Sequence, residues 1–171
     1  MRDFQNISKS ERAGLSIISA DVLNALSGAP LESHRKFSIS VFDHWLAKEE
    51  CISEIDNVTH SIEKDRNHRL HEFCVALAKS DECYLVKLRG RRKEQMTSRV
   101  FTSEEGMVRT LKPVEHNVGD NWRFVLSFPK LKAIYLEGSD FTHHVCHQSA
   151  QSKAAISALA DDHGLFVLND I

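Results

Sequence analysis

Two hydrophobic patterns divide the chain near residue 80. Before this point apolar residues recur with the period of a helix, and after it they mostly alternate with polar residues. A helical period gathers apolar side chains on one face of a helix, whereas alternation gathers them on one face of a strand. We therefore expect an α+β fold, with a helical region over 1–80 and a sheet region over 81–171 that form one integrated domain.

Three helices are expected in the N-terminal half, packed on the sheet. The first begins at the capping box formed by Ser8 and Glu11, because residues of these types at this spacing satisfy the free N–H groups of a helix start. It ends before Gly28. The third covers 52–77, either as one long helix or as two helices that meet near Asn67.

The second helix is expected over 32–49. Phe37, Val41 and Trp45 recur every four residues, which is typical of the buried face of a helix. Residues 37–41 also alternate in polarity like a strand, but the length of the apolar pattern favours the helix.

The C-terminal half predicts a mostly antiparallel sheet of about five or six strands. Its candidate strands are 83–89, 98–102, 107–112, 122–128, 133–137 and 165–168. A helix that Ser149 or Ser152 can cap, and that Gly164 ends, lies before the last of them. Because a strand, a helix and a strand in this order usually form a parallel pair, we expect one crossover helix at the C-terminus.

Composition and charge exclude some classes of function. The 171 residues carry 22 Lys and Arg against 24 Asp and Glu, so no overall charge attracts nucleic acid or a membrane. No apolar run approaches the roughly 20 residues that span a bilayer, and the N-terminus is unlike a signal peptide. The four cysteines include no Cys-x-x-Cys pair, which favours reduced thiols and a cytoplasmic location.

The densest group of potential metal ligands is a histidine and cysteine cluster at 143–147. If this segment is a strand, His144 and Cys146 share one face, and a zinc site needs at least one further ligand. His163, at the end of the following helix, is the candidate, so the hypothesis is a Zn²⁺ ion held by His144, Cys146 and His163. No other cofactor is expected. We favour the plainer interpretation of a strand end with a buried cysteine and exposed histidines, since the spacing matches no zinc motif.

A basic hairpin is the second candidate site. Its six cationic residues lie within thirteen positions and are opposed there only by Glu94. A guanidinium group can bind two phosphate oxygens at once, so the hairpin predicts binding of an anionic partner, which is nucleic acid, a nucleotide or an acidic protein surface. The alternative is a solvated edge hairpin whose charges prevent pairing with another sheet. The six residues are Lys87, Arg89, Arg91, Arg92, Lys93 and Arg99.

The sequence supports three functional hypotheses. It contains no G-x-S-x-G motif, P-loop or dinucleotide-binding motif, so we favour a non-enzymatic binding or regulatory protein that acts by protein–protein interaction. Self-association into a homo-oligomer is compatible with this function. The first alternative is a nucleic-acid-associated protein that uses the basic hairpin 87–99, and the second is a metal- or cysteine-dependent enzyme centred on 143–147.

Overall fold

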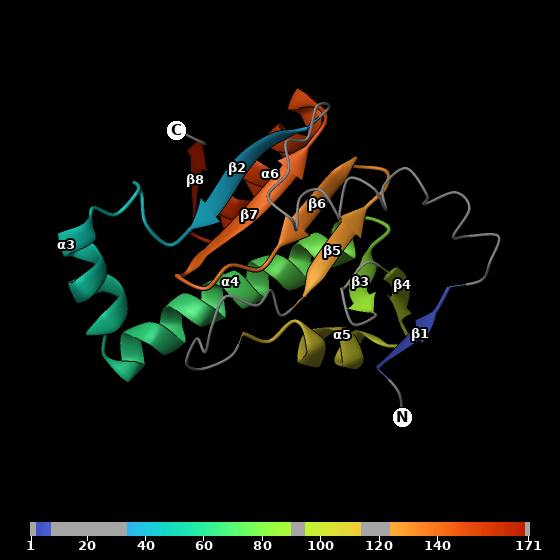
Figure 1. Ribbon diagram of the computed structural model, residues 1–171, viewed down its shortest axis with the longest axis horizontal. Helices are drawn as coiled ribbons and strands as arrows, with labels where there is room; N and C mark the ends of the chain where they lie inside the picture. Colours follow the sequence, from blue (N-terminus) through green and yellow to red (C-terminus); the bar gives the residue numbers. More distant parts are fainter. Residues whose placement is uncertain (1–2, 8–33, 90–94, 114–123, 170–171) are drawn as a thin grey trace.

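The computed structural model describes residues 3–7, 34–89, 95–113 and 124–169, and within them the fold is α+β with a single sheet (Figure 1). Its eight strands are β1 (Phe4–Asn6), β2 (Arg35–Ser40), β3 (Tyr84–Arg89), β4 (Gln95–Phe101), β5 (Val125–Phe128), β6 (Ala133–Leu136), β7 (Thr142–His147) and β8 (Phe166–Asn169). The four α-helices of these residues are α3 (Lys48–Cys51), α4 (His60–Ser80), α5 (Glu104–Thr110) and α6 (Ala150–Asp162), and the π-helix η1 (Ile52–Asp56) directly follows α3.

The strand order across the sheet is β1-β4-β3-β5-β6-β7-β2-β8, and every neighbouring pair is antiparallel. The predicted number of five or six strands is therefore wrong. The predicted helical N-terminal half is also wrong, because β1 and β2 both come from the first 80 residues. These two strands pair with β4 and with β7 and β8, so strands from both halves of the chain form one sheet.

The helix predicted over 32–49 is wrong in its first half. Residues 35–40 form β2, which lies between β7 and β8, and its last four residues are all buried. A strand that is buried on both faces needs small or apolar side chains at every position, which Phe37, Ser38, Ile39 and Ser40 provide. The alternation at 37–41 thus predicted the structure correctly, and the four-residue spacing of Phe37, Val41 and Trp45 did not.

Two further helices differ from the predictions. The strand expected at 107–112 is wrong, because these residues belong largely to α5. Ser103 caps this helix by accepting a hydrogen bond from the Gly106 N–H at 3.0 Å, and two glutamates lie in its first turn. The helix expected from Ser8 lies outside the described residues. The segment around Asn67 is the interior of one continuous helix, α4, which begins only at His60.

The C-terminal helix is confirmed as α6. Ser149 caps it by accepting a hydrogen bond from the Ser152 N–H at 3.0 Å, and Gly164 follows its end with a φ of 65°. The flanking strands β7 and β8 run parallel, but the prediction that they lie next to each other in the sheet is wrong. β2 lies between them and pairs antiparallel with both, since it enters the sheet from a distant part of the sequence.

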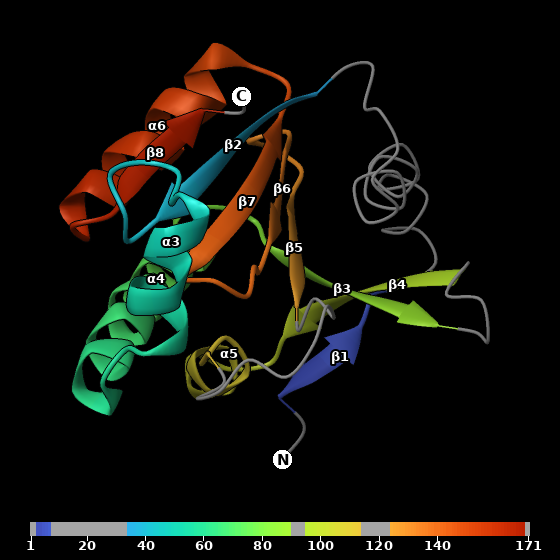
Figure 2. The same ribbon diagram turned by 60° about the vertical axis from the view of Figure 1, so that its left-hand side comes forward.

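The main core lies between the sheet and a layer of helices. Figure 2 shows α4 and α6 on the same face of the sheet. Phe73 of α4 packs against Tyr135 of β6 with ring centroids 6.0 Å apart, and Ile156 of α6 is buried in the same cluster. α4 buries side chains only from Leu70 onward, so its N-terminal turns lie beyond this core.

The opposite face of the sheet is buried as well. Directly paired residues of antiparallel strands share a face, so Phe37, Tyr135 and Val145 form one row across β2, β6 and β7. Because Tyr135 faces α4, the adjacent row, which includes Ser38 and His144, faces away from the helices. This alternation decides where each histidine of β7 points.

Candidate functional site

The histidine and cysteine cluster lies on a strand and is divided between its two faces. His143 faces the helices, where its Nδ1 forms a hydrogen bond with the buried Tyr135 hydroxyl. His144 faces the other way, with its Nδ1 2.8 Å from the hydroxyl oxygen of Ser38. Cys146 is fully buried on the same face as His144. Ser38 is also fully buried, so this serine–histidine pair offers no hydroxyl that a substrate can reach.

His163 lies on the helix side of the sheet. Its ring packs edge-on against Phe73 of α4, with centroids 6.3 Å apart. The sheet therefore separates His163 from His144 and Cys146, and the structure does not bring these three predicted ligands together. In the described ranges, no group of three His, Cys, Asp or Glu side chains is placed to hold a metal ion.

The predicted basic hairpin is described only at its base. Lys87 and Arg89 belong to β3 and Arg99 to β4, whereas Arg91, Arg92 and Lys93 lie outside the described residues. The guanidinium of Arg99 lies 4.5 Å from the centroid of the Phe4 ring of β1, so it takes part in the packing at this edge of the sheet.

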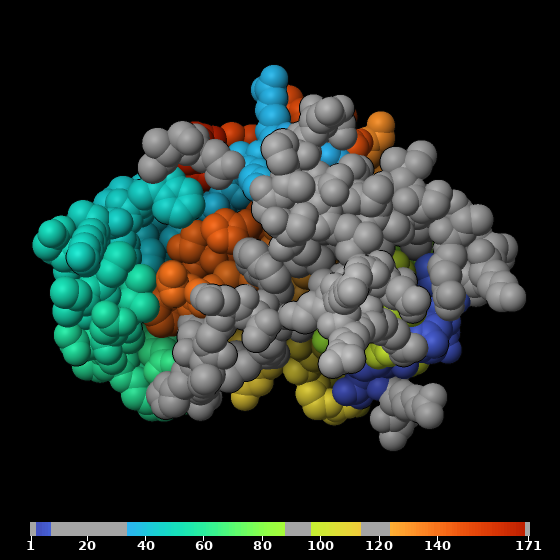
Figure 3. Space-filling view, in the orientation of Figure 1, coloured from blue at the N-terminus to red at the C-terminus, as the bar shows by residue number. Residues whose placement is uncertain are grey.

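A hollow of about 180 Å³ lies where β2 leaves the sheet and β7 enters it. We call it the β2–β7 hollow. Its apolar lining residues are Phe42, Trp45, Leu46, Cys51, Ile55 and Leu168. Its polar lining residues are His44, Ser139, Asp140, Thr142 and His144. On the molecular surface in Figure 3, the segment that contains α3 (cyan) lies beside the start of β7 (orange).

Two exposed aromatic residues flank the β2–β7 hollow. Trp45 is 40% exposed, and its Nε1 donates a hydrogen bond to the backbone oxygen of Asn169 at 3.0 Å. Phe166 is 46% exposed and lies two residues before Leu168 on the same face of the edge strand β8. Both residues lie beside the same recess, which makes this surface the candidate interaction site.

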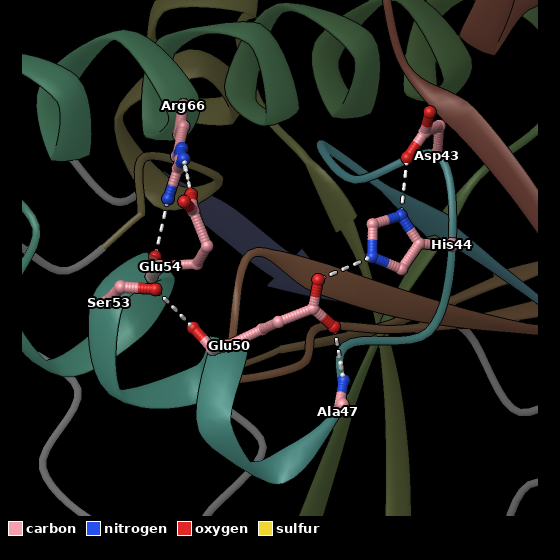
Figure 4. A network of polar contacts seen from close by, with 7 residues as sticks. All are labelled: Asp43, His44, Ala47, Glu50, Ser53, Glu54 and Arg66. Atoms are coloured by element: carbon pink, nitrogen blue, oxygen red, sulfur yellow. Dashed lines mark hydrogen bonds and ion pairs between the residues drawn. The ribbon is translucent and has the colours of Figure 1, made fainter.

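A charged network holds the loop at the rim of the hollow (Figure 4). The Nδ1 of His44 lies 2.5 Å from the carboxylate of Asp43, and its Nε2 lies 3.2 Å from that of Glu50. These two carboxylates raise the pKa of His44, and the hydrogen bond from His44 lowers the pKa of Asp43. The other oxygen of Glu50 accepts a hydrogen bond from the Ala47 N–H at 2.7 Å, so the same network caps α3 and lowers the pKa of Glu50.

Arg66 of α4 holds the outer wall of the hollow, which is the η1 segment that supplies Ile55 to the lining. Its guanidinium donates to the backbone oxygen and the carboxylate of Glu54 on η1, as Figure 4 also shows. It lies 4.9 Å from the ring centroid of Phe42 and 5.4 Å from that of Phe141. One side chain thus joins α4 and η1 to the aromatic residues beside the hollow. π-Helices are rare and often lie at functional sites, and this one supplies Ile55 to the lining.

Sequence reasoning found part of this site. His144 was a candidate ligand, but Trp45 was assigned to a helix and His44 was not singled out. A usable signal was present, since the alternation of residues 37–41 breaks at Phe42, just before Asp43, His44 and Trp45. His44 has its partners nearby in Asp43 and Glu50, but Trp45 donates to Asn169, 124 positions away, and no spacing rule connects such residues.

Comparisons with protein-family models, curated proteins and solved structures gave no match for this chain. In the part of the chain that the structure describes, every helix is too short or too polar to cross a membrane.

Proposed function

We propose that this chain is a non-enzymatic binding protein that acts through contact with another protein at the β2–β7 hollow. The observation that supports this function is the exposure of Trp45 and Phe166 beside an apolar hollow. Aromatic side chains that remain exposed around a recess are typical anchors of protein interfaces, because they bury much apolar area with little loss of conformational freedom.

The rigidity of the surroundings is a second argument for binding. The rim loop is held by the Asp43–His44–Glu50 network, and the outer wall is held by Arg66. A surface that is already ordered loses less entropy when a partner binds, which strengthens binding for a given contact area. A cytoplasmic location and a regulatory role are part of this proposal, and the four free cysteines agree with a reducing compartment.

Affinity capture with matched surface variants tests the proposal. We expect wild-type protein to retain a partner in stoichiometric amount, and Phe166→Ser to retain at least tenfold less. Ile62→Ser is the control, because Ile62 is 45% exposed on α4 and does not line the hollow. It should retain the partner as well as the wild type does. Equal retention by all three proteins, with their folding verified by circular dichroism, would contradict the proposal.

A further inference from the structure

We infer that the β2–β7 hollow receives a lysine or arginine side chain from a basic segment of the partner protein. This inference rests on the proposed function and adds the chemistry of the partner. A basic side chain combines an apolar stem with a charged end, and both halves have matching groups in the hollow.

The walls match the stem of such a side chain. Phe42, Leu46, Ile55 and Leu168 line the hollow with hydrocarbon. Lysine and arginine bury their methylene groups against apolar surface while the charged end stays near water or a counter-charge. The open rim allows this arrangement, because Trp45 and Asp140 are both lining residues and both exposed.

Asp140 provides the counter-charge. Its carboxylate accepts a hydrogen bond from the Ser139 hydroxyl at 3.0 Å, and no cationic side chain of the described residues forms an ion pair with it. The segment 41–56, which forms one side of the hollow, carries five carboxylates and a single lysine. Three of these carboxylates contact His44 or Arg66, and the region stays net negative when both are counted as cations. Acidic surroundings of this kind attract a basic partner and repel phosphate groups, which makes nucleic acid a poor occupant.

The aromatic rings at the hollow provide a second attraction for the positive charge of a basic side chain. Arg66 places its guanidinium 4.9 Å from the ring centroid of Phe42, so this ring already has a cationic partner and Trp45 is the ring for an incoming cation. Tryptophan attracts cations more strongly than other aromatic residues, and Trp45 lies exposed at the rim. A basic side chain that enters past Trp45 can therefore reach an aromatic ring and the Asp140 carboxylate together.

A random dodecapeptide library displayed on phage provides the test. Selection on the wild-type protein should enrich peptides that contain Lys or Arg next to an apolar residue. For the best synthetic peptide, exchange of its key Lys or Arg for norleucine should weaken binding at least tenfold by fluorescence anisotropy. Bound peptide should also slow the alkylation of Cys51, which lines the hollow.

Variants of the protein complete the test. Asp140→Asn should weaken the same peptide about tenfold, and Glu72→Gln, an exposed carboxylate on α4 away from the hollow, should change binding less than twofold. Enriched peptides that are acidic or uncharged would overturn the basic-side-chain inference while leaving the protein-binding function intact. Undiminished binding to Asp140→Asn would also overturn it. If Phe166→Ser retains every selected peptide, the hollow is not the binding site and the proposed function itself falls.

Discussion

The charge of a single histidine depends on where the loop after β2 places it. His44 has a carboxylate near each ring nitrogen, and both nitrogens can donate only when the ring is protonated. This geometry explains why its pKa is raised, first by Asp43 and then by Glu50. The stabilisation that His44 gives is complete below its unfolded pKa of about 6.5 and is lost as the pH rises through the raised folded pKa.

Replacement of Glu50 should lower the pKa of His44. In Glu50→Gln we expect the pKa of His44 to fall toward its ordinary value, because one of the two carboxylates that favour the imidazolium is gone. Histidine resonances followed by NMR against pH measure the change. Glu49→Gln is the control, since it removes a neighbouring charge that makes no hydrogen bond to His44. An equal pKa of His44 in the two variants would refute the network.

At the scale of elements, the site is formed where regular structure ends. β2 stops at Ser40, α3 and η1 follow an irregular loop, and β7 begins at Thr142 after a loop of its own. Gly138 is required in this second loop, because a Cβ at that position would lie 1.8 Å from the backbone oxygen of Thr142. The hollow thus depends on connections between elements, whose paths hydrophobic periodicity does not predict.

A substitution at Arg66 tests whether this side chain joins α4 to η1. Arg66→Met should destabilise the protein by about 1–2 kcal/mol, because it removes the contacts with Glu54 and with the Phe42 and Phe141 rings. Urea unfolding measures this loss. Lys64→Met is the matched control on the exposed face of the same helix and should change stability by less than about 0.5 kcal/mol. Equal stability of the two variants would show that the guanidinium does not join η1 to α4.

At the scale of the whole molecule, the first half of the chain completes the sheet of the second half. β2 lies between β7 and β8, and the described part of β8 pairs only with β2. α4 supplies Phe73, whose ring contacts both Tyr135 and His163. The boundary near residue 80 in the hydrophobic pattern therefore marks a change of element type and does not mark the edge of the sheet.

A fragment of residues 81–171 should consequently fail to fold. It lacks β2, so β8 loses its strand partner, and it lacks α4, so one wall of the core is missing. We expect circular dichroism to record no cooperative thermal transition for this fragment, and addition of a 1–80 fragment to restore one. Cooperative unfolding of 81–171 alone would contradict the interdigitated sheet.

The sequence by itself determined the features that neighbouring residues control. The α+β class and α6 with its Ser149 cap follow from periodicity and capping within a few turns. It also predicted the alternation that divides His143 from His144, although not which face lies against the helices. The tertiary structure decided the rest. Burial on both faces made residues 35–40 a strand, and pairing across a hundred positions brought His44 and Trp45 to Asp140 and Leu168. Such long-range pairing depends on the packing of the complete sheet, which no local pattern records.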